Sequence, residues 1–245
     1  MRQGPADAIV VGAGPVGWWA AKALCGRGRR VQWLDAGPVL PAESFRVTGV
    51  TRDLFSPRYQ LFRLKLLVRG DRERGLDKFV SQETARLFAD RREHPYAADG
   101  DGFSWTRIRA VGGRGHLWGR VMLRYTAADL ADGPAPWPVA ADALTPYYDE
   151  VEQLMELGGA PSGTPLVPDG RYVEERSLND LEAAFRRGAA LRWPDRPVVV
   201  NHVAQYPPGP WSPMLEAASR TGNLEVLPCT VARRLVFDAG GAGSG

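Results

Sequence analysis

The residues with the clearest chemical meaning form a glycine-rich turn near the start of the chain. The run Gly12-Ala13-Gly14-Pro15-Val16-Gly17 has the spacing G-x-G-x-x-G. In such a turn the first glycine permits a tight change of direction, the second lets a phosphate approach the backbone, and the third lets the following helix pack on the sheet. The N–H groups and the dipole at the start of a helix favour the negative charge of phosphates. We therefore expect a phosphate-binding turn at residues 12–17.

A carboxylate stands where a dinucleotide site would need one. Asp35 comes 23 residues after Gly12, at the end of the apolar segment Val31–Leu34. An acidic side chain at this place accepts hydrogen bonds from ribose hydroxyls, and it would repel the extra phosphate of NADP. The alternative is a tight turn without a ligand, in which Asp35 only caps backbone groups. The spacing fits FAD and NAD equally.

A second glycine-rich segment begins at Arg109 and ends at Arg120 (RAVGGRGHLWGR). Gly112 and Gly113 would let backbone N–H groups reach an anionic or ring-edge ligand, and Arg114 or Arg120 could pair with a phosphate. A glycine-rich loop without a ligand explains the spacing equally well. The segment becomes informative only together with the first motif.

The elements around the first motif predict a βαβ unit. Ala8–Val11 is a short apolar run without polar alternation, which is typical of a strand buried on both faces of a parallel sheet. A helix is expected from Val16 to Arg27, ended by Gly28, and a second strand at Val31–Leu34. Strand, glycine turn, helix and strand in this order are typical of a Rossmann-like domain.

Capping and periodicity predict the remaining elements. A helix should begin at Thr145, with Pro146 in its first position, and run to about Leu157; a helix face explains Glu150 and Glu152 better than an acid/base pair does. Charged and apolar residues mix in a solvated surface segment, Leu61–Lys78. Further elements are expected as helices at Ser177–Leu191 and Pro213–Thr221 and as strands at Asn223–Val226 and Val231–Asp238. The glycine-rich residues 239–245 follow the last strand, so the chain is expected to stop within a hairpin.

Composition excludes several classes of function. The 245 residues carry a formal net charge of only +3, which argues against nucleic acid or an anionic membrane as a partner. The two cysteines, Cys25 and Cys229, lack the spacing of a metal or redox motif and are expected to stay reduced. No signal peptide or membrane span is visible, so we expect a cytoplasmic globular protein.

With both glycine motifs in view, the sequence resembles the glucose-methanol-choline (GMC) family of flavoprotein oxidoreductases, in particular a bacterial branch similar to pyranose oxidase. The first motif and Leu34-Asp35-Ala36-Gly37 resemble the family's ADP-binding start, although many members have Glu at the place of Asp35. Val111-Gly112-Gly113 through Trp118-Gly119 and Leu123-Arg124 resembles its flavin-proximal loop. Asp129, Trp137-Pro138, Pro146-Tyr147-Tyr148-Asp149 and Glu152 follow the order of the branch, and Cys229-Thr230-Val231 resembles the strand that brackets adenine.

The resemblance implies FAD as the cofactor and a particular set of contacts. The residues it assigns to FAD are Gly12, Gly14, Pro15, Val16, Gly17, Asp35, Ala36, Gly112, Gly113 and Val231. Members with covalently bound flavin carry histidine directly before the loop tryptophan, where this chain has Leu117, and His116 is one residue earlier. A covalent link is therefore not expected, and His94 and His202 receive no role. We expect no metal site.

The implied fold is α/β: a Rossmann-like FAD/NAD(P)-binding domain with part of an inserted substrate or cap domain. Residues 1–130 and 212–245 would form the FAD-binding domain, and residues 131–211 the insertion. The family's catalytic base, a histidine paired with histidine or asparagine, comes from a C-terminal half for which this chain shows no motif. The chain is thus expected to be truncated, and no catalytic residue is named.

Three hypotheses remain for the function. The first is an FAD-dependent oxidoreductase that acts on CH–OH groups of an alcohol or a sugar by hydride transfer to flavin. The second is a non-catalytic FAD-binding protein or subunit that needs a partner chain. An NAD-dependent dehydrogenase is disfavoured, because such enzymes do not require the second glycine motif.

Overall fold

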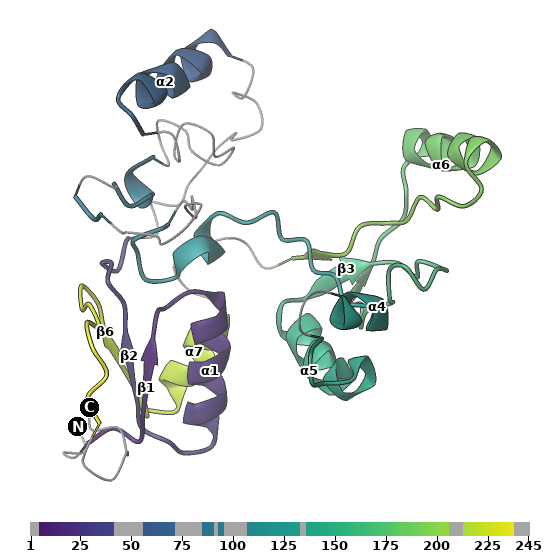
Figure 1. The fold of residues 1–245 in the computed structure, drawn as a ribbon. Coiled ribbons are helices and arrows are strands. Elements are labelled where there is room, and N and C mark those ends of the chain that lie inside the picture. Colours follow the sequence, from purple (N-terminus) through teal and green to yellow (C-terminus); the bar gives the residue numbers. More distant parts are fainter. Residues whose placement is uncertain are drawn as a thin grey trace. The chain divides into compact units, whose positions relative to one another are not determined.

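A computed structural model describes residues 5–41, 56–71, 85–90, 93–95, 107–132, 136–205 and 213–237 (Figure 1). The chain divides into two compact units. The first unit contains Met1–Leu117 and Pro208–Gly245, and the second contains Trp118–Pro207. Compactness alone does not assign a role to either part, so the expected division into cofactor-binding domain and insertion stays a prediction.

The first unit is built on a parallel sheet of three strands, β1 (Ala8–Val11), β2 (Val31–Leu34) and β6 (Leu224–Leu227), in the order β1-β2-β6. Val31 lies opposite Ala8 on one side and opposite Leu224 on the other. All three strands of this sheet were expected from the sequence, and β6 is shifted by one residue from its expected range. The α/β class with a parallel sheet is confirmed.

Helices α1 (Pro15–Gly26) and α7 (Pro213–Arg220) pack against this sheet beside one another (Figure 1). The core between them contains Cys25 from α1, Val31 from β2 and Ala218 from α7. The expectation that β1 is buried on both faces is wrong for the described residues. Its side chains alternate, and Val11 remains 62% exposed. The physical reason is that both helices meet the same residues of the sheet and so cover one face.

A further part of the first unit contains helix α2 (Pro57–Val68) and the short 3₁₀ turns η2 (Ala85–Leu87) and η3 (Gly113–His116). Its core consists of Leu66, Leu87, Phe88 and Leu117. The segment expected only as a solvated surface therefore holds a helix with a buried residue, Leu66. Ser56 caps this helix by accepting a hydrogen bond from the backbone N–H of Tyr59.

The described residues of the second unit form a small mixed sheet and three helices. Strand β3 (Leu157–Gly159) lies between β4 (Glu174–Glu175), to which it is parallel, and β5 (Val203–Ala204), to which it is antiparallel. The helices are α4 (Ala127–Ala131), α5 (Ala141–Leu154) and α6 (Asp180–Arg192).

Two expectations for the second unit are wrong, and one is confirmed. Helix α5 begins at Ala141, so Pro146 lies inside it rather than at its first position. Leu157 is the start of a buried strand instead of a helix end. The helix expected at Ser177–Leu191 is present as α6, which begins at Asp180 because Asn179, the second of the two expected caps after Ser177, forms a reciprocal capping box with Glu182.

The end of the described chain differs from the prediction. Residues 231–236 form no regular strand, and only Phe237 takes part in a bridge. The glycine-rich residues 239–245 and the loop at residues 96–102 lie outside the described residues. No described helix combines the length and the apolar character that crossing a membrane requires.

Candidate functional site

The glycine turn connects β1 to α1, and its three glycines meet different constraints. Gly12 has φ +93°, which side chains rarely tolerate, and a Cβ on Gly17 would overlap the carbonyl oxygen of Gly12. Gly14 differs from both. Its φ of −80° suits any residue, and a Cβ there would have no protein atom within 4 Å. The protein itself therefore requires Gly12 and Gly17, whereas Gly14 leaves open space in front of the turn.

Helix α1 begins directly behind this open space. Pro15 occupies its first position, Val16 is 85% exposed, and no side chain caps the helix. The first turn of a helix has N–H groups without intrahelical partners, and they attract an anion. The turn thus has both the room and the polarity that a phosphate group needs.

Two tryptophan side chains hold the carbonyl oxygens of the turn from the protein side. The indole N–H of Trp33 on β2 donates to Gly12 O at 3.0 Å, and that of Trp18 on α1 donates to Ala13 O at 2.9 Å. Both rings are buried. These residues carried no recognisable signal in the sequence, because an indole that binds a loop carbonyl has no fixed spacing from that loop.

Asp35 joins the turn to the end of β2. Its Oδ2 accepts a hydrogen bond from Ala13 N at 2.8 Å, and its Oδ1 accepts one from Gly37 N at 2.7 Å. The backbone-capping role is therefore real. Each carboxylate oxygen has two lone pairs, so the same group can also accept from ribose hydroxyls. That second role stays a prediction.

The second glycine motif lies against the first. Gly112 N donates to Ala13 O at 2.8 Å, and a Cβ on Gly113 would lie 3.2 Å from the Cα of Gly14. Both glycines have positive φ, +107° and +51°. The structure therefore brings Gly112 and Gly113 together with the phosphate turn within the first unit.

His116 supports this second loop. Its Nε2 lies 2.6 Å from Val111 O, its side chain is 2% exposed, and a Cβ on Gly112 would overlap its ring. The ring occupies the space beneath the loop and holds it by a hydrogen bond. Of the two arginines that could pair with phosphate, Arg114 belongs to the first unit and Arg120 to the second.

A cavity of about 270 Å³ lies at the carboxyl ends of the strands of the parallel sheet. Four predicted site residues line it, namely Gly12, Asp35, Ala36 and Val231. Val231 lies in the wall of this cavity because the chain, beyond the end of β6, runs beside residues 35–37. Thr230 N donates to Asp35 O at 2.8 Å there. Ligands of open parallel sheets bind at this end of the strands.

The same cavity contains basic residues that the sequence did not single out. Arg107, Arg109 and His94 lie in its wall. The guanidinium of Arg107 donates to the backbone oxygen of His94 at 2.8 Å, which connects the two sides of this wall. The only signal was the alternation of basic and apolar residues before the second glycine motif. A volume near the lower end of the usual range for ligand sites, roughly 300 Å³, suits part of a dinucleotide.

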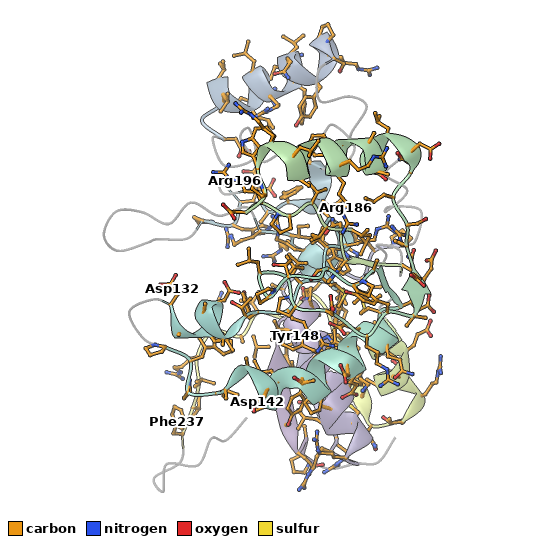
Figure 2. The ribbon with its side chains drawn as sticks, turned by 90° about the vertical axis from the view of Figure 1, so that its right-hand side faces the viewer. Asp132, Asp142, Tyr148, Arg186, Arg196 and Phe237 are labelled. Atoms are coloured by element: carbon orange, nitrogen blue, oxygen red, sulfur yellow. The ribbon has the colours of Figure 1, made fainter. Side chains whose placement is uncertain are left out.

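Two acidic residues of the second unit, Asp149 and Glu152, form an ion-pair cluster with Arg124. Arg124 donates to Glu152 at 2.8 Å through Nε and to Asp149 at 2.6 Å through Nη2. Glu152 lies on a face of helix α5, as expected, but this side chain is only 3% exposed. Hydrogen bonds from Arg124 to Glu152 raise the pKa of the guanidinium above its ordinary value. The partners lie along α5, on which Figure 2 labels Asp142 and Tyr148.

The second unit has a larger cavity and a buried histidine, but neither adjoins a predicted site residue. The cavity, about 640 Å³, lies between the start of α6 and residues 198–203. The ring of His202 is 1% exposed and lies 2.9 Å from the hydroxyl of Tyr172, and burial raises the pKa of that hydroxyl. Among the described residues no group of three His, Cys, Asp or Glu side chains could hold a metal ion.

Comparison with known proteins gives a structural likeness. No family model matches the chain, and no curated protein matches it by sequence. Pyridoxine 4-oxidase from Mesorbium loti has a similar structure, with a TM-score of 0.50 and 17% identity over 96% of this chain. Two variants of formate oxidase from Aspergillus oryzae RIB40 give TM-scores of 0.48 and 0.47 at 16% identity over 95% of this chain, and 40% of theirs.

The chain spans 44% of the length of pyridoxine 4-oxidase. Pyridoxine 4-oxidase is a GMC oxidoreductase, and the part of it that this chain matches is the N-terminal one. The family resemblance drawn from the two glycine motifs is therefore confirmed at the level of the fold. At this identity the likeness extends to the fold alone.

Proposed function

We propose that this chain binds FAD in its first unit and forms the cofactor-binding part of a flavin-dependent oxidoreductase. Its fold is that of the N-terminal part of a GMC oxidoreductase. The observation that carries the proposal is the meeting of the two glycine loops beside one cavity. Gly112 N donates to Ala13 O, and Gly12, Asp35, Ala36 and Val231 line the cavity at the strand ends.

The residues present fit the ADP half of this cofactor. The space in front of Gly14 and the uncapped start of α1 suit a pyrophosphate. Asp35 has lone pairs left for the ribose hydroxyls, and Val231 lies in the wall where the adenine would be bracketed. Gly112 and Gly113 would then lie along the flavin half. Hydride acceptance from a CH–OH carbon is the chemistry that the flavin supplies when bound.

The substrate class, an alcohol or a sugar, rests on the family resemblance alone. We name no catalytic residue. His116 and His202 each use a ring nitrogen in a buried hydrogen bond. What the described residues of the first unit do is bind and orient: they fix the two loops and keep an anion-binding surface open.

The proposal is tested by substitution of Gly14→Val with FAD binding as the readout. The Cβ of a valine there would have no protein atom within 4 Å, and its methyl groups would occupy the phosphate space, so we expect the Kd for FAD to rise by at least roughly tenfold while the thermal unfolding midpoint stays close to that of the wild type. Equilibrium titration with FAD and flavin absorbance of the purified protein measure this.

Gly26→Val is the matched control, because Gly26 is the last residue of the same helix and a Cβ there also meets nothing within 4 Å. Its affinity for FAD should equal that of the wild type. Undiminished FAD binding in Gly14→Val, or a colourless wild-type protein that binds NAD instead, would contradict the proposal. Anaerobic bleaching of the bound flavin by a panel of alcohols and sugars then distinguishes an oxidoreductase from a non-catalytic FAD-binding subunit.

A further inference from the structure

The carbonyl oxygen of Ala13 is the point at which the two glycine loops are joined. It accepts two hydrogen bonds, one from Gly112 N at 2.8 Å and one from the indole Nε1 of Trp18 at 2.9 Å. The first bond comes from the second glycine loop, and the second comes from α1. A single backbone oxygen thus connects the phosphate turn, its helix and the loop assigned to the flavin.

Trp18 contacts the second loop directly as well as through this oxygen. A Cβ on Gly115 would overlap Cη2 of the Trp18 ring, so the ring packs closely against η3 at that residue. Trp18 is 5% exposed. The side chain therefore fixes Ala13 O by its N–H and supports η3 by its ring.

Trp33 makes a comparable hydrogen bond, but to the first glycine loop only. Its indole N–H donates to Gly12 O at 3.0 Å, and Gly12 belongs to the first loop alone. One tryptophan thus holds only the phosphate turn, and the other holds the turn in register with the second loop. This difference allows the two roles to be separated by experiment.

We propose that Trp18 is a positioning residue that sets the register between the two glycine loops, and thereby preassembles the surface on which both halves of FAD bind. The inference rests on the proposed function of this site. Loops that are already in place lose little conformational entropy when the ligand binds. Loss of the register should therefore lower the affinity for a ligand that contacts both loops more than the affinity for a ligand that contacts only the first. FAD would contact both loops, whereas ADP would contact only the first.

The test compares Kd values for FAD and ADP in the 245-residue chain. Trp18→Phe keeps an aromatic side chain but removes the N–H together with one ring of the indole; we expect the Kd for FAD to rise roughly three- to tenfold, with a change of less than about twofold for ADP. Trp33→Phe should weaken both ligands by the same factor. Trp19→Phe is the control on the same helix, because Trp19 is partly exposed and its ring lies 5.3 Å from the amine of Lys22. It should change neither value.

A second variant and a ligand-free measurement guard against a simple folding defect. Gly115→Ala displaces the Trp18 ring from the other side and should shift the ratio of the two Kd values in the same direction. Amide hydrogen exchange at Gly112 should become faster in Trp18→Phe, because its acceptor is no longer fixed. An unchanged ratio of Kd values, or unchanged exchange at Gly112, would overturn the inference. A wild-type chain that binds neither FAD nor ADP would overturn the proposed function itself.

Discussion

Single backbone acceptors and donors determine the geometry of the phosphate turn. Asp35 accepts from Ala13 N and from Gly37 N, so one carboxylate ties the loop after β1 to the loop after β2. Hydrogen bonds to an ionised group are worth about 1.5–3 kcal/mol when the group is well placed. The same side chain therefore serves the fold before any ligand arrives.

We expect Asp35→Asn to lower the free energy of unfolding by roughly 1–3 kcal/mol, because an amide offers one acceptor oxygen where two N–H groups need one each. Asp7→Asn is the control, since the exposed Asp7 accepts from only one backbone N–H, that of Arg30, at 2.7 Å, and should cost less than about 1 kcal/mol. Urea denaturation measures both. Equal losses of unfolding free energy in the two variants would show that the second hydrogen bond accepted by Asp35 does not add to stability.

At the scale of elements, local side-chain caps mark the starts of helices α2, α4 and α6. Thr126 and Asp129 form a reciprocal capping box at α4, in which Thr126 N and the Thr126 hydroxyl both donate to Oδ2 of Asp129 at 2.7 Å. These bonds favour the ionised carboxylate, and they lower the pKa of Asp129. The cap is therefore a feature that depends on pH.

The sign of this dependence follows from the lowered pKa. The contribution of Asp129 to the cap is present above its unfolded pKa of about 3.9, and it is lost as the pH falls through the folded value. An NMR titration should show the carboxyl of Asp129 and the amide of Thr126 changing together, below the pH at which an unfolded Asp titrates. In Thr126→Val one donor is removed, so the pKa of Asp129 should rise. A pKa equal to that of a free peptide in both proteins would rule out the cap.

At the scale of the whole molecule, the chain divides into two compact units. The stability of the second unit depends on a buried ion pair between Glu152 and Arg124. Glu152 is 3% exposed, and its carboxylate accepts hydrogen bonds from Arg124 and from the backbone N–H of Arg171, the latter at 2.6 Å. Loss of one partner of such a pair leaves the other charge buried without compensation, at a cost of about 3–5 kcal/mol. The stability of the two units should therefore respond separately to substitution.

We expect Glu152→Gln to lower the unfolding midpoint of the second unit and to leave that of the first unit unchanged. The change should appear as a second transition in a denaturant titration followed by hydrogen exchange of amides in β2 and in β3. Asp149→Asn is the control: the Asp149 side chain is 37% exposed, so its bond to Arg124 should contribute less than about 1 kcal/mol. A single transition that shifts as a whole would show that the two units unfold together.

The sequence alone determined the parts whose causes lie within a few residues. The βαβ unit was predictable because the glycine turn, the apolar strands and Asp35 occur in the order that the motif requires. Helix α6 was predictable because Asn179 caps it locally. Helix α2 could have been predicted from Ser56-Pro57 in the same way, since a capping serine directly before a proline is typical of the start of a helix.

Only the tertiary structure decided which distant residues meet. The joining of the two glycine loops at Ala13 O depends on Trp18, whose indole N–H has no sequence signature. The burial of Glu152 depends on Arg124 from another part of the second unit, and the basic wall of the cavity depends on how Arg107 and Arg109 fold over the strand ends. Local patterns specify turns, caps and strands, whereas a shared acceptor or a buried charge pair exists only once segments far apart in the chain have packed together.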